Sequence, residues 1–238
     1  MTRTLIDGVR WMTRGTELIQ EGMSRLSDDQ IAEASVLDNW TRKHLVAHIA
    51  ANADALRNLV HWARTGEERP MYSSPSQRNE DIEAGSTRPA AELRAWVLAS
   101  AHALGEDVAS LTAEQWSREV VTAQGRTVPA SEIPWLRSRE ALVHATDLGA
   151  GVTFADLPQD FLSALAQDIV DKRSAAQDGP AIALTAIDTG ERWSLSGSSD
   201  GTEVQGRLAD IVAYLAGRPH DELTTPTGAA LPALSKWL

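Results

Sequence analysis

The stretch IPWLRSREALVHATDLG, residues 133–149, carries ionisable side chains on the face of a helix that should be buried. Helical geometry places a mixed set of side chains within roughly 60° of Glu140, namely Ile133, Leu136, Val143, His144 and Asp147. A carboxylate or an imidazole left unpaired in a protein core costs on the order of several kcal/mol. These groups must therefore be paired with one another, solvated or bound to a cation.

An earlier helical segment offers a partner for that face. It begins at Thr41, a residue suited to an N-cap, ends at Gly66, and has an apolar stripe formed by Leu45, Ile49, Leu56, Leu59 and Ala63. His48 lies roughly 60° from the centre of this stripe and His44 roughly 100°. We therefore expect His48 to point into the margin of a helical bundle and His44 to lean toward solvent.

Glu140 and His144 stand one helical turn apart, which places an oxygen and a nitrogen near enough to hold one ion. His48 would complete a set of two histidines and one glutamate and leave a position open for water or substrate, as in catalytic zinc sites. Asp147 is then expected to orient an imidazole N–H group. On spacing alone, a buried hydrogen-bond network of the same three residues without metal is nearly as good an interpretation. His61, His102 and His220 show no such convergence.

Helical periodicity of apolar residues extends over the first two thirds of the chain. Four long helical patterns cover about residues 4–26, 41–65, 87–110 and 131–148, and predict an up–down four-helix bundle. Gly8, Gly15 and Gly22 recur along the first of them and indicate close backbone packing. A short helix at 112–115 and a hairpin or irregular loop at 119–129 are expected before the fourth pattern. Residues 66–85 form a connection so long that it is expected to be functional or loose, and it could cap one end of the bundle.

The pattern changes after residue 151. A helix is predicted over 157–172, strands over 181–187, 191–197 and 202–204, and a last helix over 207–216. The predicted fold class is therefore α+β, with a metal-binding four-helix bundle over residues 1–155 and a small α+β domain over residues 156–238.

Composition excludes several classes of function. The net charge of −11 argues against nucleic acid and against an anionic membrane surface as partners. The absence of cysteine excludes a thiolate metal site and a cysteine nucleophile, so any thiol chemistry would need a small-molecule thiol from outside the chain. No stretch approaches the roughly 18 apolar residues of a membrane span. We expect a monomeric cytoplasmic protein.

The segments WTRKHLVAH (residues 40–48) and SREALVHATDLG (residues 138–149) resemble those of the DinB-like four-helix metalloenzymes. Within that superfamily the chain is most similar to the mycothiol-dependent maleylpyruvate isomerases. That closer resemblance rests on NLVHWARTGEE (58–68), Met71-Tyr72, TAQGRTVPASE (122–132) and AYLAGR (213–218), and it covers essentially the whole chain.

The resemblance implies one zinc ion per chain, bound by His48, Glu140 and His144, with mycothiol as the thiol cosubstrate. It implies isomerisation of maleylpyruvate to fumarylpyruvate in gentisate breakdown. It also implies that Arg218, in the second domain, is catalytic, and we expect its guanidinium to hold a carboxylate. Without the resemblance, Arg218 would be interpreted as an exposed cation near a helix C-terminus.

Two other functions remain open at this point. A mycothiol S-transferase of the same superfamily would keep the three ligands and act on another electrophile. A non-catalytic binding protein would have a bundle that has lost its metal. Assays with maleylpyruvate and other electrophiles separate the first from the isomerase, and elemental analysis tests the second.

Overall fold

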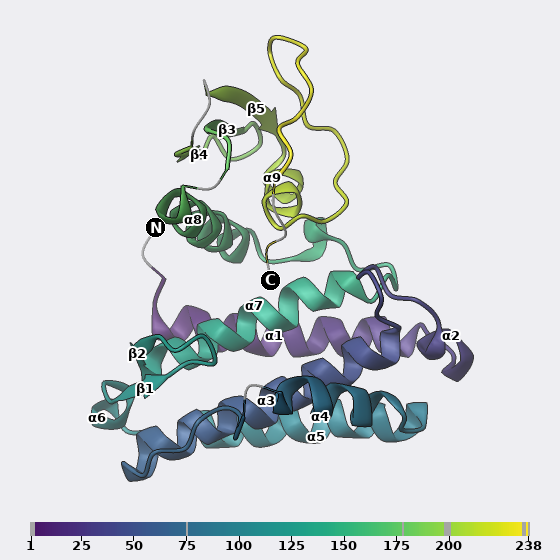
Figure 1. Ribbon diagram of the computed structural model, residues 1–238, viewed down its shortest axis with the longest axis vertical. Helices are drawn as coiled ribbons and strands as arrows, with labels where there is room; N and C mark the ends of the chain where they lie inside the picture. The colour runs from purple at the N-terminus through teal and green to yellow at the C-terminus, as the bar shows by residue number, and fades with distance from the viewer. Residues whose placement is uncertain (1–2, 75, 178, 198–200, 235–236, 238) are drawn as a thin grey trace. The chain divides into compact units, whose positions relative to one another are not determined.

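A computed structural model describes residues 3–74, 76–177, 179–197, 201–234 and 237 (Figure 1). The chain forms two compact units, one spanning Thr4–Val152 and the other containing Thr153–Leu238. The first unit is helical and the second combines helices with a small sheet, so the predicted α+β class is confirmed.

The first unit is a bundle of four long helices with shorter elements between them. In chain order its elements are α1 (Leu5–Ser24), α2 (Asp28–Ala32), α3 (Arg42–Thr65), α4 (Gln77–Ser86), α5 (Ala90–Ala109), α6 (Ala113–Trp116), β1 (Glu119–Val121), β2 (Thr127–Pro129), the 3₁₀ turn η1 (Ala130–Glu132) and α7 (Ile133–Asp147). Helix α7 packs against both α1 and α3, and α3 also packs against α5 (Figure 1). The core between these helices includes Leu56, Leu59, Leu104 and Ile133, all essentially inaccessible to solvent.

Local signals set the ends of α3. Thr41 is its N-cap, and the Thr41 side chain accepts a hydrogen bond from the backbone N–H of His44. The His44 Nδ1 atom lies 2.7 Å from Thr41 Oγ1, so this imidazole belongs to the cap. Gly66 ends the helix in the left-handed conformation, with φ of 82°, as glycine readily does. Both predicted ends of this helix are confirmed.

Gly8 and Gly15 of α1 lie where α7 approaches and Gly22 faces the segment just after α7, in line with the close packing that their spacing predicted. A Cβ atom added to Gly15 would lie 2.7 Å from the Cβ of Ala141, and one added to Gly8 would lie 3.1 Å from the Cβ of Pro134. Glycine therefore lets the backbones of α1 and α7 come closer than larger residues would permit.

The connection after α3 contains a helix, α4, that the sequence did not predict. This helix has no side-chain N-cap and only a weak amphipathic pattern, so local signals are poor. Tertiary packing replaces them: Ile82 is buried, and a Cβ added to Gly85 would lie 2.7 Å from the Cβ of Ala47 on α3. The short helix α2 was not predicted from the sequence either, whereas α6 and the hairpin of β1 and β2 were predicted.

The second unit contains the 3₁₀ turn η2 (Phe154–Asp156), α8 (Gln159–Ala176), β3 (Ile182–Ala186), β4 (Arg192–Leu195), β5 (Thr202–Gly206) and α9 (Leu208–Leu215). The strand order is β4-β3-β5, with β3 antiparallel to β4 and parallel to β5. Helix α8 packs against α9 and β4. The predicted helices and all three predicted strands are present, with their ends shifted by a few residues.

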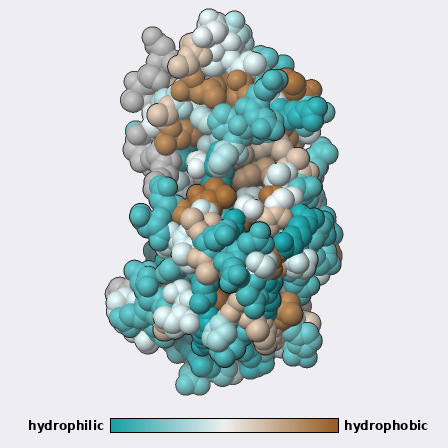
Figure 2. Space-filling view, turned by 90° about the vertical axis from the view of Figure 1, so that its right-hand side faces the viewer, coloured by the Kyte–Doolittle hydropathy of each residue, from teal (hydrophilic) through white to brown (hydrophobic). Residues whose placement is uncertain are grey.

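On the face shown in Figure 2, hydrophilic residues cover most of the surface of the helical unit. Within the described part of the chain, no helix combines the length and the apolar character that a membrane crossing requires.

The glycine contact between α1 and α7 gives a stability prediction. Gly15→Ala should lower the free energy of unfolding by about 1–3 kcal/mol, because overpacking outweighs the better helix propensity of alanine. Gly105→Ala on α5 is the matched control: its added Cβ meets no atom within 4 Å, and stability should rise by about 0.5–1 kcal/mol. Urea unfolding of both variants measures the two effects. Equal stabilisation by both would contradict close packing at Gly15.

Candidate metal centre

Helices α3 and α7 bring His48 and Glu140 together across the bundle. His48 lies in the second turn of α3 and is 3% exposed, and its Nε2 atom is 2.9 Å from Glu140 Oε2. The indole of Trp40 packs edge-on against the imidazole, with ring centroids 5.5 Å apart. His48 thus points into the bundle, as its angular position predicted.

One turn after Glu140, His144 reaches the same carboxylate oxygen. Its Nε2 atom lies 3.4 Å from Glu140 Oε2. The ligand atoms of His48, Glu140 and His144 all lie within 4.8 Å of one another. A tetrahedral ion with bonds of about 2.0–2.2 Å separates its ligand atoms by about 3.4 Å, so small side-chain adjustments would close this set around one cation.

Asp147 determines how the His144 ring is used. Its fully buried carboxylate lies 2.8 Å from His144 Nδ1, and therefore accepts a hydrogen bond from that nitrogen. In the neutral ring the Nε2 atom then carries a lone pair that faces the Glu140 carboxylate, which also only accepts. Two acceptors in contact require a proton or a metal cation between them. The role expected of Asp147, to orient an imidazole, matches this geometry.

The charges of the cluster are strongly coupled. Burial disfavours the cationic form of His144, but hydrogen bonds to Asp147 and Glu140 outweigh it and raise the pKa of the imidazole to about 9. Burial also opposes ionisation of Glu140, yet hydrogen bonds from His144 and His48 hold its pKa well below the usual range. Burial lowers the pKa of His48. A cation in place of the His144 proton would satisfy all three ligand atoms, so the residues present fit a divalent metal.

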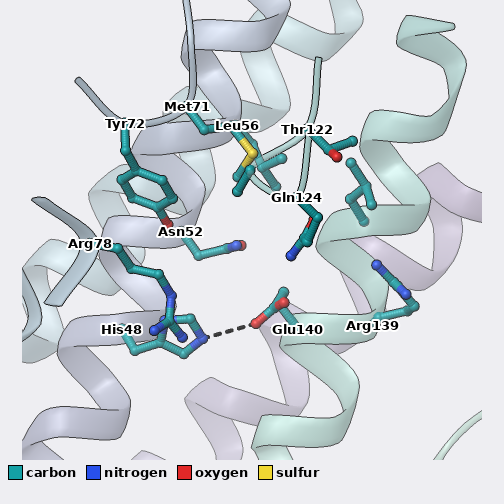
Figure 3. Close-up of a pocket in the computed structure, with 12 residues that line it drawn as sticks. His48, Asn52, Leu56, Met71, Tyr72, Arg78, Thr122, Gln124, Arg139 and Glu140 are labelled. Carbon is teal, nitrogen blue, oxygen red and sulfur yellow. Dashed lines mark hydrogen bonds and ion pairs between the residues drawn. The ribbon is translucent and has the colours of Figure 1, made fainter. Parts of the chain in front are cut away.

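A cavity of about 460 Å³, partly open to solvent, lies beside the cluster, with His48 and Glu140 in its wall (Figure 3). Its polar lining comes from several elements: Asn52 of α3, Tyr72 and Arg78 from the segment before and within α4, Gln124 of the hairpin turn, and Arg139 of α7. Leu56, Met71 and Leu136 form its apolar wall. Burial raises the pKa of Tyr72 to about 12, so its hydroxyl stays protonated at neutral pH.

None of these five polar residues is predicted from the sequence to be part of the site. Asn52 could have been found, because it follows His48 by four residues and so shares its helical face. Tyr72 and Gln124 lie in segments that carry the family resemblance, and Tyr72 and Arg78 lie in the long connection 66–85, but no local pattern placed these three side chains beside the metal ligands. The folded connection 66–85 and the hairpin turn thus complete the cavity.

Arg218 lies in the other unit, just after α9, and is 9% exposed. Its Nη1 atom donates hydrogen bonds to the carbonyl oxygens of Ala216, at 2.7 Å, and Trp237, at 3.0 Å. Arg218 is therefore buried, and is not the exposed cation expected near a helix C-terminus. The other histidines lie outside the cluster: His44 caps α3, and His61, His102 and His220 make separate contacts.

Comparisons with known proteins extend this picture. Residues 13–149 match the family described as the mycothiol maleylpyruvate isomerase N-terminal domain. A crystal structure of the mycothiol-dependent maleylpyruvate isomerase is 42% identical in sequence, with a TM-score of 0.94 and coverage of 100% of both chains. A crystal structure of a histidine-to-alanine variant of such an isomerase is 41% identical, again with a TM-score of 0.94 and full coverage of both chains. No curated protein matches the chain at a significant level.

The geometry predicts that His48→Ala removes bound metal. We expect about one divalent ion per purified chain and a loss of affinity of more than about 100-fold in the variant, beyond the effect of losing an outer hydrogen-bond partner. The bundle should stay folded, because its core does not depend on this side chain. His102→Ala, at an exposed position on α5, is the matched control and should retain its metal. Elemental analysis with circular dichroism measures both, and full metal content in His48→Ala would remove His48 from the site.

Proposed function

Because the chain belongs to the mycothiol-dependent maleylpyruvate isomerase family, we propose that it isomerises maleylpyruvate to fumarylpyruvate with mycothiol as cosubstrate. The observation that carries this proposal is the cluster of His48, Glu140 and His144 beside a cavity that His48 and Glu140 line, in a chain similar over its whole length to such an isomerase. Gentisate breakdown, which forms maleylpyruvate, is the proposed setting.

We further propose that the metal is zinc, held by His48, Glu140 and His144. Nitrogen and carboxylate ligands suit zinc, and three protein ligands leave a coordination position open, which is typical of catalytic sites. Zinc bound there would supply Lewis acidity, either lowering the pKa of the thiol or polarising a substrate carbonyl. First-row ions such as cobalt or nickel could also occupy this ligand set.

The reaction needs a nucleophile that the chain does not contain. The thiolate sulfur of mycothiol adds to one carbon of the cis double bond, and the π electrons move to the conjugated carbonyl oxygen as an enolate. The former double bond is now single and can rotate. Collapse of the enolate restores the double bond in the trans form and expels the thiolate, so the thiol is regenerated. The absence of cysteine agrees with a borrowed thiol.

The cavity supplies cations that suit a substrate with two carboxylates. Arg78 and Arg139 both line it, although the whole chain carries a net charge of −11. Guanidinium groups bind carboxylates with paired hydrogen bonds, and local positive charge raises the concentration of an anionic substrate at the site. Leu56, Met71 and Leu136 add an apolar wall beside these cations. For Arg218 we keep the role implied by the family resemblance, a carboxylate clamp on the second unit.

A mycothiol S-transferase would use the same metal and thiol, and a metal-free binding protein would use neither. The family membership and full-length similarity favour the isomerase. Purified protein with maleylpyruvate and mycothiol should form fumarylpyruvate, followed by absorbance and chromatography. Conjugation of other electrophiles without isomerisation would support the transferase instead.

Turnover should depend strictly on an added low-molecular-weight thiol. A free thiol ionises near pH 8.5, so only a few per cent is thiolate at neutral pH, and coordination to a cation would raise that fraction. Extensively dialysed enzyme should show no isomerisation until mycothiol is added, and glutathione should be far less effective. Steady turnover without thiol would overturn the mechanism, whereas equal rates with glutathione would remove only the assignment of mycothiol.

Arg218→Lys should lower kcat/KM by about 10- to 100-fold at unchanged metal content. Lysine keeps the charge but loses the planar fork that binds a carboxylate through two hydrogen bonds. Because Arg218 also donates to two backbone carbonyls, the melting temperature must be measured alongside. A lower melting temperature with unchanged kcat/KM would make Arg218 a structural residue only.

A further inference from the structure

Arg137 of α7 is a fully buried cation without an ion pair in the described part of the chain. Its Nη1 atom donates to two oxygens of α3: the carbonyl of Ile49 at 2.7 Å and the side-chain Oδ1 of Asn52 at 2.9 Å. The Nε and Nη2 atoms are buried and have no hydrogen-bond partner among the described residues.

Stability alone does not explain this arrangement. A buried cation without a direct ion pair, and with two nitrogens that lack hydrogen-bond partners, is destabilising on the order of several kcal/mol. Attraction to the Glu140 and Asp54 carboxylates offsets only part of this cost, because burial still lowers the pKa of the group. Burial lowers the pKa of Arg137 to about 10, which leaves it protonated at neutral pH. An apolar side chain of similar length would fill the same volume without this penalty. Arg137 therefore has a role beyond stability, which it exerts through a group that it contacts. Asn52 is its one side-chain hydrogen-bond partner among the described residues.

The contact with Arg137 decides which way the Asn52 amide faces. Amide oxygen and nitrogen are often hard to tell apart, but a guanidinium only donates hydrogen bonds, so the atom that it contacts must be the oxygen. The Nδ2 group then lies on the opposite side. Asn52 lines the cavity beside His48 and Glu140, and Figure 3 shows its amide projecting into that space. No described residue accepts a hydrogen bond from Nδ2.

A fixed N–H donor at this place suits an oxygen acceptor on a ligand. Maleylpyruvate presents carboxylate and carbonyl oxygens, and thiolate addition places negative charge on one of its carbonyl oxygens. A donor already aimed at such an oxygen stabilises the charge as it develops.

We propose that Asn52 binds substrate, donating a hydrogen bond from Nδ2 to a substrate oxygen, and that Arg137 is the positioning residue that holds the amide in this orientation. The inference rests on the proposed isomerase function. It adds a neutral donor to the cavity, distinct from the metal ligands and from the arginines Arg78 and Arg139.

Asn52→Asp is the sharpest test. Aspartate has the same shape and still accepts from Arg137, so the contact between α3 and α7 is kept and the buried cation gains a direct ion pair. The atom facing the cavity, however, changes from a donor to an acceptor. We expect kcat/KM to fall by at least 100-fold with normal metal content and an unchanged or higher melting temperature. A purely structural role for Asn52 would be preserved by aspartate.

Two further variants separate the lost donor from the added charge. Asn52→Ala removes the donor without adding charge, and its kcat/KM should fall by 10- to 100-fold. Gln124→Glu adds the same charge to the wall of the same cavity and should have a smaller effect than Asn52→Asp. Binding of acetopyruvate, a diketo acid that cannot isomerise, should weaken in Asn52→Ala when measured by calorimetry. Wild-type kcat/KM and acetopyruvate affinity in Asn52→Ala, with equal losses in the two charged variants, would overturn the proposal.

A double-mutant cycle with Arg137→Met tests the positioning role. If Arg137 acts through Asn52, then Asn52→Ala should reduce kcat/KM much less in the Arg137→Met background than in the wild type. Independent, multiplicative losses would contradict it. Should Arg137→Met fail to fold, the Asn52 variants still decide whether the amide binds substrate. Wild-type turnover is measured first: an inactive wild type refutes the proposed function, whereas an active wild type with unaffected Asn52 variants refutes this inference alone.

Discussion

The carboxylate of Glu140, held between α3 and α7 with its side chain 18% exposed, is the group on which the site depends. A carboxylate there requires positive charge or donors from its surroundings, and two imidazoles provide them, His48 from the facing helix and His144 from the next turn. This need links the register of α3 against α7 to the chemistry of the cavity. A shift of one residue in either helix would rotate a ligand by about 100° out of the cluster. The packing of α3 against α7 and the placement of the candidate metal ligands therefore depend on the same helix register.

Helix α7 satisfies two demands on neighbouring faces. Toward α1 it meets Gly15, where backbones approach closely and no polar group is needed. Toward α3 it presents Glu140 and Arg137, both ionised and both met by α3 side chains. The close contact with α1 supports the polar one, because a helix whose backbone is fixed along one face holds the side chains of the adjoining face within a narrow range of positions.

Positive charge is concentrated near the cavity of a chain that is acidic overall. The chain is acidic overall, yet the cavity and its surroundings contain Arg78, Arg139 and the buried Arg137. A potential that is positive only near the cavity would direct an anionic substrate to the metal centre while the acidic surface discourages association with other anions. Burial of Arg137 lowers the stability of the bundle. The apolar core residues, which are almost completely removed from water, offset this cost.

The sequence by itself determined much of this protein. Caps such as Thr41 and Gly66, 3.6-residue periodicity and the spacing of Glu140 and His144 are local features, so the long helices, the small α+β unit and the convergence of the three candidate ligands could be predicted. The absence of cysteine meant that any thiol chemistry would need a thiol from outside the chain. Only the tertiary structure decided that α4 forms, since its helix depends on packing against α3. It also decided that Tyr72, Arg78 and Gln124 meet beside the ligands, and that the Asn52 amide turns its nitrogen to the cavity. These features arise from contacts between residues far apart in the chain, which periodicity and capping do not encode, because the energy that selects them appears only when the helices pack.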